Sequence, residues 1–119
     1  MKITSNDSLV KKLRKNTILH KSQIIKAFYK TPRRLFVPED YAGEAYEDYS
    51  IPLGIDQSIL KPSYVALMTE LLDVKRSQKI LVVGTGSGWQ AAILAKLVGE
   101  RGKVYGIEVD KKLFHFSIN

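Results

Sequence analysis

The chain has 119 residues, no cysteine and a net charge of +7 at pH 7. This length allows one domain, and the lack of cysteine excludes disulfides, thiolate catalysis and cysteine-ligated zinc. No apolar run approaches the ~20 residues of a membrane span, and residues 1–8 lack the apolar segment of a secretion signal. We therefore expect a soluble, cytoplasmic protein with no membrane partner.

The positive charge is concentrated in the first 35 residues, which hold ten Lys/Arg and one acid, Asp7. The rest hold nine Lys/Arg and eleven acids, so the two parts carry +9 (10 − 1) and −2 (9 − 11). Such a basic segment can contact nucleic acid or an acidic substrate, or can be solvated helical surface. Because only Phe28 and Tyr29 are interleaved with the cations, we favour solvated surface and expect no nucleic-acid partner.

Two short helices are predicted at the N-terminus. The first ends near Asn16, and the second begins at Ser22 as its cap and stops before Pro32, because the residue before a proline avoids the helical region. The cap of the first helix is expected at one of three adjacent polar residues: Ser5, Asn6 or Asp7.

Residues 31–58, called the cover segment below, are predicted to be rich in loops because proline and glycine recur along them. So much aromatic area would not remain in solvent, so we expect the segment to pack on the core of the domain. Four aromatic residues lie in it: Phe36, Tyr41, Tyr46 and Tyr49.

The second half of the chain predicts a helix opened by Pro62 and then a strand–helix–strand unit. The apolar run 79–83 is typical of a strand buried on both faces, residues 88–98 of a helix and residues 103–108 of a second, parallel strand. We therefore predict an α/β fold in two parts. Residues 1–62 form a helical and loop cover, and residues 63–119 begin a Rossmann-like nucleoside-binding domain.

A glycine-rich turn follows the first of these strands. Gly84, Gly86 and Gly88 form a G-x-G-x-G pattern, and Trp89 occupies the position where a dinucleotide fingerprint has its third small residue. Glycine allows a ligand to approach the backbone, and the next helix directs N–H groups into the same space. The spacing suits a ligand without a pyrophosphate, so S-adenosylmethionine is preferred to NAD.

An acid, Glu108, ends the second strand about twenty residues beyond the turn. A carboxylate at this place can accept hydrogen bonds from ribose hydroxyls. A tight strand–helix turn without any ligand is the alternative interpretation of the glycines. The strand before the turn, the helix after it and the acid at this offset argue against that alternative.

Several short motifs resemble one enzyme family, protein-L-isoaspartate O-methyltransferase, over roughly residues 8–112. They are Pro32-Arg33 with Phe36-Val37, Ala45-Tyr-Glu-Asp48, Ile51-Pro-Leu-Gly54, Gln57-Ser-Ile-Leu-Lys-Pro62 and Gly84 to Ala92. The resemblance implies a Rossmann-like methyltransferase fold and methyl transfer from S-adenosylmethionine to the carboxylate of isoaspartyl residues in damaged proteins or peptides. The 51–62 element is specific to that family, whereas many methyltransferases share the glycine motif.

The resemblance also assigns roles to residues. Gln57, Ser58 and Ile59 would line the junction of cofactor and substrate, and no metal is implied. The other cofactor-binding positions would be Gly84, Thr85, Gly86, Gly88, Glu108 and Val109.

Three departures from the family pattern bear on activity. Leu60 stands where the family has a catalytic serine, and Ser58 keeps a hydroxyl ~6–7 Å away along an extended segment. Val82 replaces an acid that the family often has before the first glycine. The chain also stops early, so we expect strand 79–83 to expose an apolar edge that a second copy or a partner chain covers.

Three functional hypotheses follow. The chain is an isoaspartyl methyltransferase sequence, a non-catalytic S-adenosylmethionine-binding or assembly module, or a nucleic-acid methyltransferase with a basic contact region. His20 is expected to be a surface residue, and neither His20 nor His115 belongs to a recognisable catalytic or metal-binding pattern. Trp89 is expected to pack between the helix and the cover segment.

Overall fold

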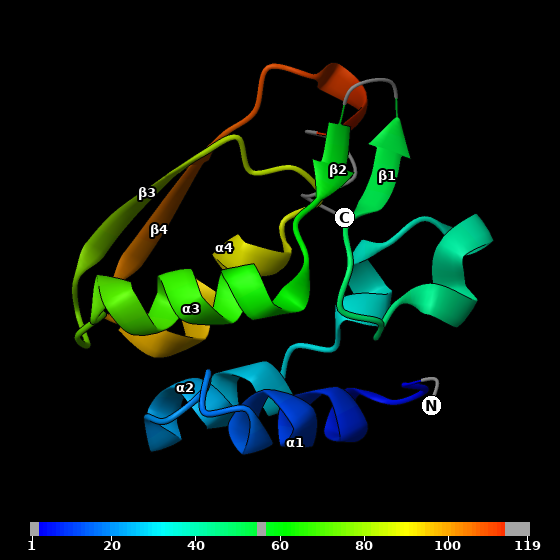
Figure 1. The fold of residues 1–119 in the computed structure, drawn as a ribbon. Helices are drawn as coiled ribbons and strands as arrows, with labels where there is room; N and C mark the ends of the chain where they lie inside the picture. The colour runs from blue at the N-terminus through cyan, green and yellow to red at the C-terminus, as the bar shows by residue number, and fades with distance from the viewer. Residues whose placement is uncertain (1–2, 55–56, 114–119) are drawn as a thin grey trace.

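The structure is a computed structural model that describes residues 3–54 and 57–113. Its helices and strands are arranged as Figure 1 shows, and no helix in the described part is long and apolar enough to cross a membrane. In chain order the elements are α1 (Asn6–Lys15), α2 (Ser22–Tyr29), the 3₁₀ helices η1 (Arg33–Phe36) and η2 (Glu39–Glu44), β1 (Ile51–Gly54), β2 (Gln57–Ile59), α3 (Pro62–Leu72), β3 (Lys79–Val83), α4 (Trp89–Val98) and β4 (Lys103–Ile107).

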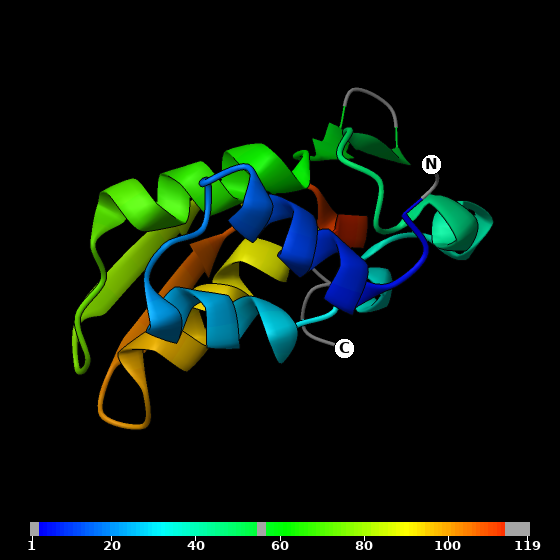
Figure 2. The ribbon, with the colours of Figure 1, turned by 60° about the horizontal axis from the view of Figure 1, so that its bottom comes forward.

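The predicted strand–helix–strand unit is confirmed. Strands β3 and β4 pair in parallel from Lys79 opposite Lys103 to Val83 opposite Ile107, and α4 packs on both. Helix α2 packs on α4 and α1 packs on α2, so the N-terminal helices lie beyond α4 rather than along the sheet (Figure 2).

The prediction that β3 is buried on both faces is wrong. Val82 is buried, but Leu81 and Val83 are 57% and 75% exposed. Alternate residues of a strand face opposite sides of the sheet, and α4 covers only the side that Val82 occupies. A continuous apolar run indicates two buried faces only when helices cover both.

A hairpin lies within the cover segment, where the sequence predicted loops. Strands β1 and β2 are antiparallel, with Ile51 opposite Ile59 and an irregular register between Pro52 and Gly54. Proline and glycine are the residues that usually argue against a strand, yet both are tolerated at the edge of a short sheet. The expected packing is confirmed, because Phe36, Tyr41 and Tyr46 lie against the core, although Tyr49 is 44% exposed.

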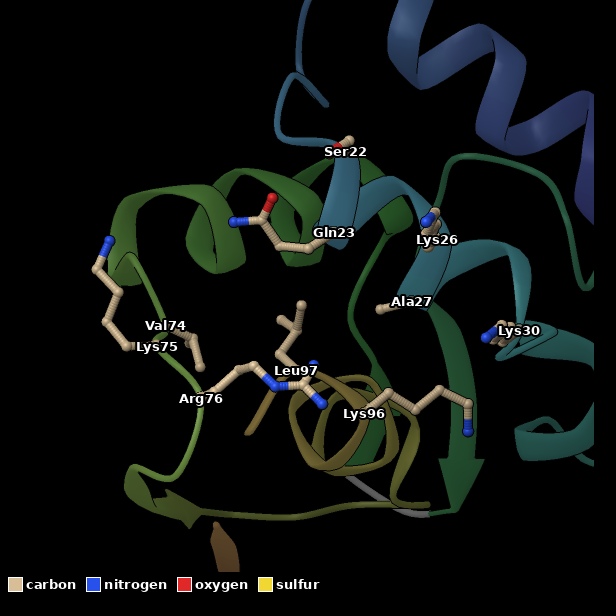
Figure 3. Close-up of a pocket in the computed structure, with 10 residues that line it drawn as sticks. All are labelled: Ser22, Gln23, Lys26, Ala27, Lys30, Val74, Lys75, Arg76, Lys96 and Leu97. Carbon is tan, nitrogen blue, oxygen red and sulfur yellow. The ribbon is translucent and has the colours of Figure 1, made fainter. Parts of the chain in front are cut away.

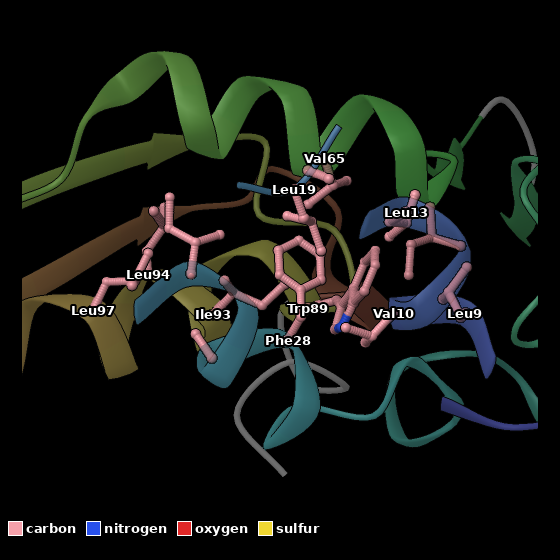
Figure 4. Packing of buried hydrophobic residues seen from close by; sticks show 14 of the residues in the cluster. Leu9, Val10, Leu13, Leu19, Phe28, Val65, Trp89, Ile93, Leu94 and Leu97 are labelled. Atoms are coloured by element: carbon pink, nitrogen blue, oxygen red, sulfur yellow. The ribbon is translucent and has the colours of Figure 1, made fainter. Parts of the chain in front are cut away.

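The core is continuous across the predicted division at residue 62. Trp89 lies at its centre beside Phe28, with ring centroids 5.7 Å apart and an edge-to-face angle of 83° (Figure 4). The indole N–H of Trp89 donates to the carbonyl of Thr31 at 2.9 Å. The predicted packing of Trp89 between helix and cover segment is therefore confirmed, while the division into two parts stays a prediction.

The sequence predicted the N-terminal cap of α1 but not that of α2. Ser5, one of the three predicted candidates, caps α1, since its hydroxyl accepts the N–H of Ser8 at 3.1 Å. Ser22 does not cap α2, because it is already the first helical residue. A residue from α3 instead binds the two residues that precede the helix. The carboxylate of Glu70, itself 8% exposed, accepts the N–H groups of His20 and Lys21 at 2.9 and 3.1 Å.

Replacing Glu70 with alanine is expected to lower the free energy of unfolding by about 1–3 kcal/mol. The substitution removes the acceptor for two backbone N–H groups at the start of α2 and the negative charge that favours a helix N-terminus. Urea denaturation followed by circular dichroism measures the change. Glu100→Ala, an exposed site, is the control and should stay within about 0.5 kcal/mol; equal effects of the two changes would contradict this role of Glu70.

Candidate functional site

The glycine turn follows β3 and has a left-handed backbone at all three glycines. Their φ angles are +75° at Gly84, +60° at Gly86 and +99° at Gly88. Apart from its chain neighbours, a Cβ at Gly84 would meet no atom of the described residues within 4 Å, so the backbone conformation and the need for an open approach, rather than a clash, explain the glycine there.

Backbone hydrogen bonds tie the turn to the end of β4. The N–H groups of Gly84 and Thr85 donate to the carbonyl of Ile107 at 2.8 and 3.1 Å. The N–H of Gly86 donates to Oε1 of Glu108 at 2.7 Å. These three amides bond to the protein and fix the shape of the turn, so the N–H groups expected to face a ligand remain those at the start of the following helix.

Glu108 therefore has a structural role that the sequence did not suggest. Its second oxygen, Oε2, accepts the N–H of Asp110 at 3.0 Å, so both oxygens hold the backbone. A carboxylate oxygen has two acceptor sites, so each still has capacity for one further donor, such as a ribose hydroxyl. Val109, which follows it, is 90% exposed.

A small cleft of about 150 Å³ lies between the turn and the end of the cover segment. The structure brings Ser58, Ile59 and Leu60 to one side of it, and places Gly84, Thr85 and Gly86 on the other. Residues that are 24 or more positions apart in sequence thus form opposite walls. The other predicted positions, Gln57, Gly88, Glu108 and Val109, do not line this cleft.

Ser87 also lines the cleft and was missed by the sequence analysis. It is 3% exposed, and its hydroxyl has no hydrogen-bond partner among the described residues. Beside it, α4 begins at Trp89 after Gly88, which has no side chain to bind the first amides of the helix. An unpaired hydroxyl and a helix N-terminus together suit a ligand that carries a negative charge.

Arg33 holds the cover segment in place and was quoted in the sequence only as part of a motif. It is fully buried, and its guanidinium donates four hydrogen bonds of 3.0–3.1 Å to backbone carbonyls. The acceptors are Ala45, Glu47, Tyr49 and Leu60. Since Leu60 lines the cleft, Arg33 links one wall of the site to the core.

The charge of Arg33 is retained despite its burial. Removal from water lowers the pKa of Arg33 to about 10, while the charges of Asp48 and Tyr49 act in the opposite direction. The guanidinium carbon lies 5.5 Å from the ring centroid of Trp89, a cation–π distance. Asp48 also contributes to the site's frame, because its carboxylate accepts the N–H of Ser63 in the first turn of α3 at 2.8 Å.

Gly106, in β4, is a further residue that positions the turn. A Cβ at this position would lie 2.6 Å from Oγ1 of Thr85. We expect Gly106→Ala to destabilise the fold by about 1–3 kcal/mol, because Thr85 must move and the turn moves with it. Thermal unfolding measures this. The double variant with Thr85→Ala should lose less than the sum of the single changes, and strict additivity would contradict the proposed clash.

The remaining candidates do not join this site. His20 is exposed, as expected, and contributes a backbone N–H to Glu70. His115 lies outside the described residues. Within residues 3–54 and 57–113, no group of three or more His, Asp or Glu side chains is placed to hold a metal ion.

Comparison with known families gives a match along nearly the whole chain. The family model for protein-L-isoaspartate(D-aspartate) O-methyltransferase matches residues 4–119. A relative from Archaeoglobus fulgidus, protein-L-isoaspartate O-methyltransferase 2, is 46% identical over 102 residues, which are 86% of this chain and 46% of the relative. A protein-L-isoaspartate O-methyltransferase from Methanopyrus kandleri is 40% identical over 97% of this chain and 51% of its own length. The chain thus spans about half the length of these relatives.

Solved structures agree on the fold. A Plasmodium falciparum protein described as a protein-L-isoaspartate O-methyltransferase, crystallised with S-adenosyl-L-homocysteine, matches 98% of this chain and 54% of its own with a TM-score of 0.86 and 23% identity. A second protein-L-isoaspartate O-methyltransferase matches with a TM-score of 0.78 and 28% identity, over 95% of this chain and 37% of its own. The predicted Rossmann-like methyltransferase fold with a partial sheet is confirmed.

Proposed function

The chain belongs to the protein-L-isoaspartate O-methyltransferase family, and we propose that it binds S-adenosylmethionine and presents it to the carboxylate of an isoaspartyl residue. The observation that carries this proposal is the cleft in which the 58–60 segment faces the glycine turn. The alternative of a nucleic-acid methyltransferase has no comparable support at this site.

The residues of the cleft fit such a cofactor. The buried hydroxyl of Ser87 and the first amides of α4 are donors for the carboxylate at the amino-acid end of the molecule. Glu108 does not line the cleft but bonds to Gly86 of the turn, and it keeps acceptor capacity for ribose hydroxyls at the end of β4. At about 150 Å³ the cleft is smaller than the 300–1,000 Å³ of typical ligand sites, so the described residues form only part of the proposed site.

When bound, S-adenosylmethionine supplies a methyl group on a sulfonium, which a carboxylate oxygen takes to give a methyl ester and S-adenosylhomocysteine. A carboxylate is ionised at neutral pH, so the chain needs no strong general base. Its task is to orient the reactants and exclude water. We assign that task to the 57–60 segment, which Arg33 fixes at the carbonyl of Leu60.

Leu60 weakens the catalytic part of this proposal. Its side chain is 38% exposed, lines the cleft and offers no hydrogen bond at the position of the family serine. Ser58 lines the same cleft and is exposed, so its hydroxyl is the group available there. We propose that Leu60→Ser increases methyl transfer to an isoaspartyl peptide without changing cofactor affinity.

Titration calorimetry with S-adenosylmethionine and S-adenosylhomocysteine tests the cofactor site, and radiolabelled methyl transfer to an isoaspartyl peptide tests the reaction. We expect one-to-one binding that Gly84→Val weakens at least tenfold, because valine fills the approach to the turn and disfavours φ +75°. Ser50→Ala, on an exposed loop, is the control. A folded chain that binds neither compound would overturn the proposal.

We also propose a second copy of this chain as a partner at the sheet. The face opposite α4 carries Leu81 and Val83 from β3, paired in register with Tyr105 and Ile107 of β4. All four are 49–75% exposed. Within the described residues β3 pairs only with β4, so its other edge offers a row of backbone donors and acceptors. Burial of this apolar face together with the edge supports self-association.

A further inference from the structure

A groove of about 550 Å³ lies between α2 and α4, away from the cleft described above (Figure 3). The segment 74–76, which leads into β3, forms its third side. Its lining includes three apolar residues, Ala27, Val74 and Leu97, that are themselves buried. The groove therefore has an apolar floor and a volume within the range of sites for small ligands and short peptide segments.

Five cationic side chains surround that floor. Lys26 lies on α2 and Lys30 is the C-cap residue that follows it, Lys96 lies in the last turn of α4, and Lys75 and Arg76 come from the segment before β3. All five are exposed. The sequence shows no such cluster, because these residues come from three segments that only the fold brings together.

The positive charge of the groove is largely uncompensated. Asp73 forms ion pairs with Lys75 at 3.1 Å and with Lys21 at 2.7 Å, which uses one of the five cations. Among the described residues, no carboxylate lies within ion-pair distance of Lys26, Lys30, Arg76 or Lys96, and none lines the groove. Four adjacent cations without counter-charges create a field that attracts anions.

The groove is separate from the cofactor cleft. The cleft lies at the start of α4, beside Trp89, whereas Lys96 and Leu97 lie seven and eight residues further on. At 1.5 Å per residue this places the two sites roughly 10 Å apart along the helix axis. Likewise, Arg76 precedes β3 while Gly84 follows it, so the groove is at the opposite end of the strand.

We propose that this groove binds an acidic peptide segment in which aspartate or glutamate residues flank an aliphatic side chain. The aliphatic side chain would occupy the apolar floor, and the carboxylates would pair with the cations at the rim. Nucleic acid is disfavoured because, among the residues that the structure describes, no aromatic side chain lines the groove for a base to stack on. The sugar–phosphate backbone of a nucleic acid is polar and charged, so it has little apolar surface to pack against the floor of the groove.

Fluorescence anisotropy with a labelled twelve-residue peptide of alternating glutamate and leucine tests the proposal on the full chain. We expect saturable binding that the double variant Lys26→Glu/Lys30→Glu weakens roughly tenfold or more, because like charges then face each other. Lys11→Glu/Lys15→Glu on α1 is the matched control, with the same spacing, charge change and exposure. It should leave the affinity almost unchanged, and circular dichroism checks that both variants fold.

Two further ligands distinguish specific binding in the groove from non-specific attraction between opposite charges. A peptide of alternating glutamate and serine has the same charge without the aliphatic groups, and it should bind more weakly. Equal binding of the two peptides, equal loss in both double variants, or tighter binding of a single-stranded RNA of equal charge would each overturn the proposal. Because none of these measurements uses the cofactor, their outcome is independent of the proposed methyl transfer.

Discussion

Replacing Arg33 with methionine is expected to lower the free energy of unfolding by about 3 kcal/mol or more, because it breaks a buried hydrogen-bond network. Most single-domain proteins are stable by only about 5–15 kcal/mol. A change of this size therefore leaves a large part of the population unfolded, or removes the cover segment from the core.

The reason is that Arg33 donates hydrogen bonds to four backbone carbonyls. Methionine keeps an unbranched apolar stem but has no donor, so the carbonyls of Ala45, Glu47, Tyr49 and Leu60 lose their partner together. A buried acceptor left without a partner costs about 1–3 kcal/mol. The contact with the ring of Trp89 is lost as well.

The neighbouring residue provides the control. Arg34 forms a salt bridge with Glu39 at 2.9 Å in which the glutamate side chain is 84% exposed. Arg34→Met should cost less than about 1 kcal/mol, because exposed ion pairs contribute little. Urea denaturation of both variants, followed by circular dichroism, gives the comparison. If Arg33→Met unfolds at the same urea concentration as Arg34→Met, the guanidinium does not hold the cover segment.

The second large effect is expected at the sheet. The double variant Leu81→Lys/Ile107→Lys should convert a self-associating chain into a monomer at concentrations where the unchanged chain forms dimers or larger species. Both side chains lie on the face that α4 does not cover, and both are at least half exposed. Lysine at these places would bring like charges together across any interface between two copies, which disfavours pairing.

Sedimentation velocity over a range of concentrations measures this effect. Leu35→Lys serves as the control, because Leu35 is 68% exposed on η1 rather than on the sheet. It should leave the association unchanged. A monomeric unchanged chain at high concentration would rule out the second copy, and loss of association in the Leu35 variant would place the interface elsewhere.

The sequence predicted those elements that are specified by a few neighbouring residues. Ser5 caps α1 and Pro62 opens α3, because a cap hydroxyl and a fixed φ act on the adjacent turn. The glycine turn between β3 and α4 was found in the same way, since the left-handed φ angles at Gly84, Gly86 and Gly88 require glycine locally. The motifs in and around these elements also sufficed to identify the family.

The interactions that the sequence could not predict join residues far apart in the chain. Glu70 binds the backbone just before α2 across about fifty residues, and Arg33 reaches Leu60 across twenty-seven. The hairpin of β1 and β2 was missed because its proline and glycine are typical of loops. The exposure of Leu81 depends on which face of the sheet a helix covers.

The sequence by itself determined the family, the parallel strand–helix–strand unit and the glycine turn, because each depends on backbone preferences and spacing within a short segment. Only the tertiary structure decided that Glu108 fixes the turn, that Ser87 presents an unpaired hydroxyl to the cleft, and that cations from α2 and α4 meet in one groove. Packing sets these relationships. A buried group forms its hydrogen bonds with whichever segment the fold places beside it. The sequence does not state how close in space two segments lie when they are far apart along the chain.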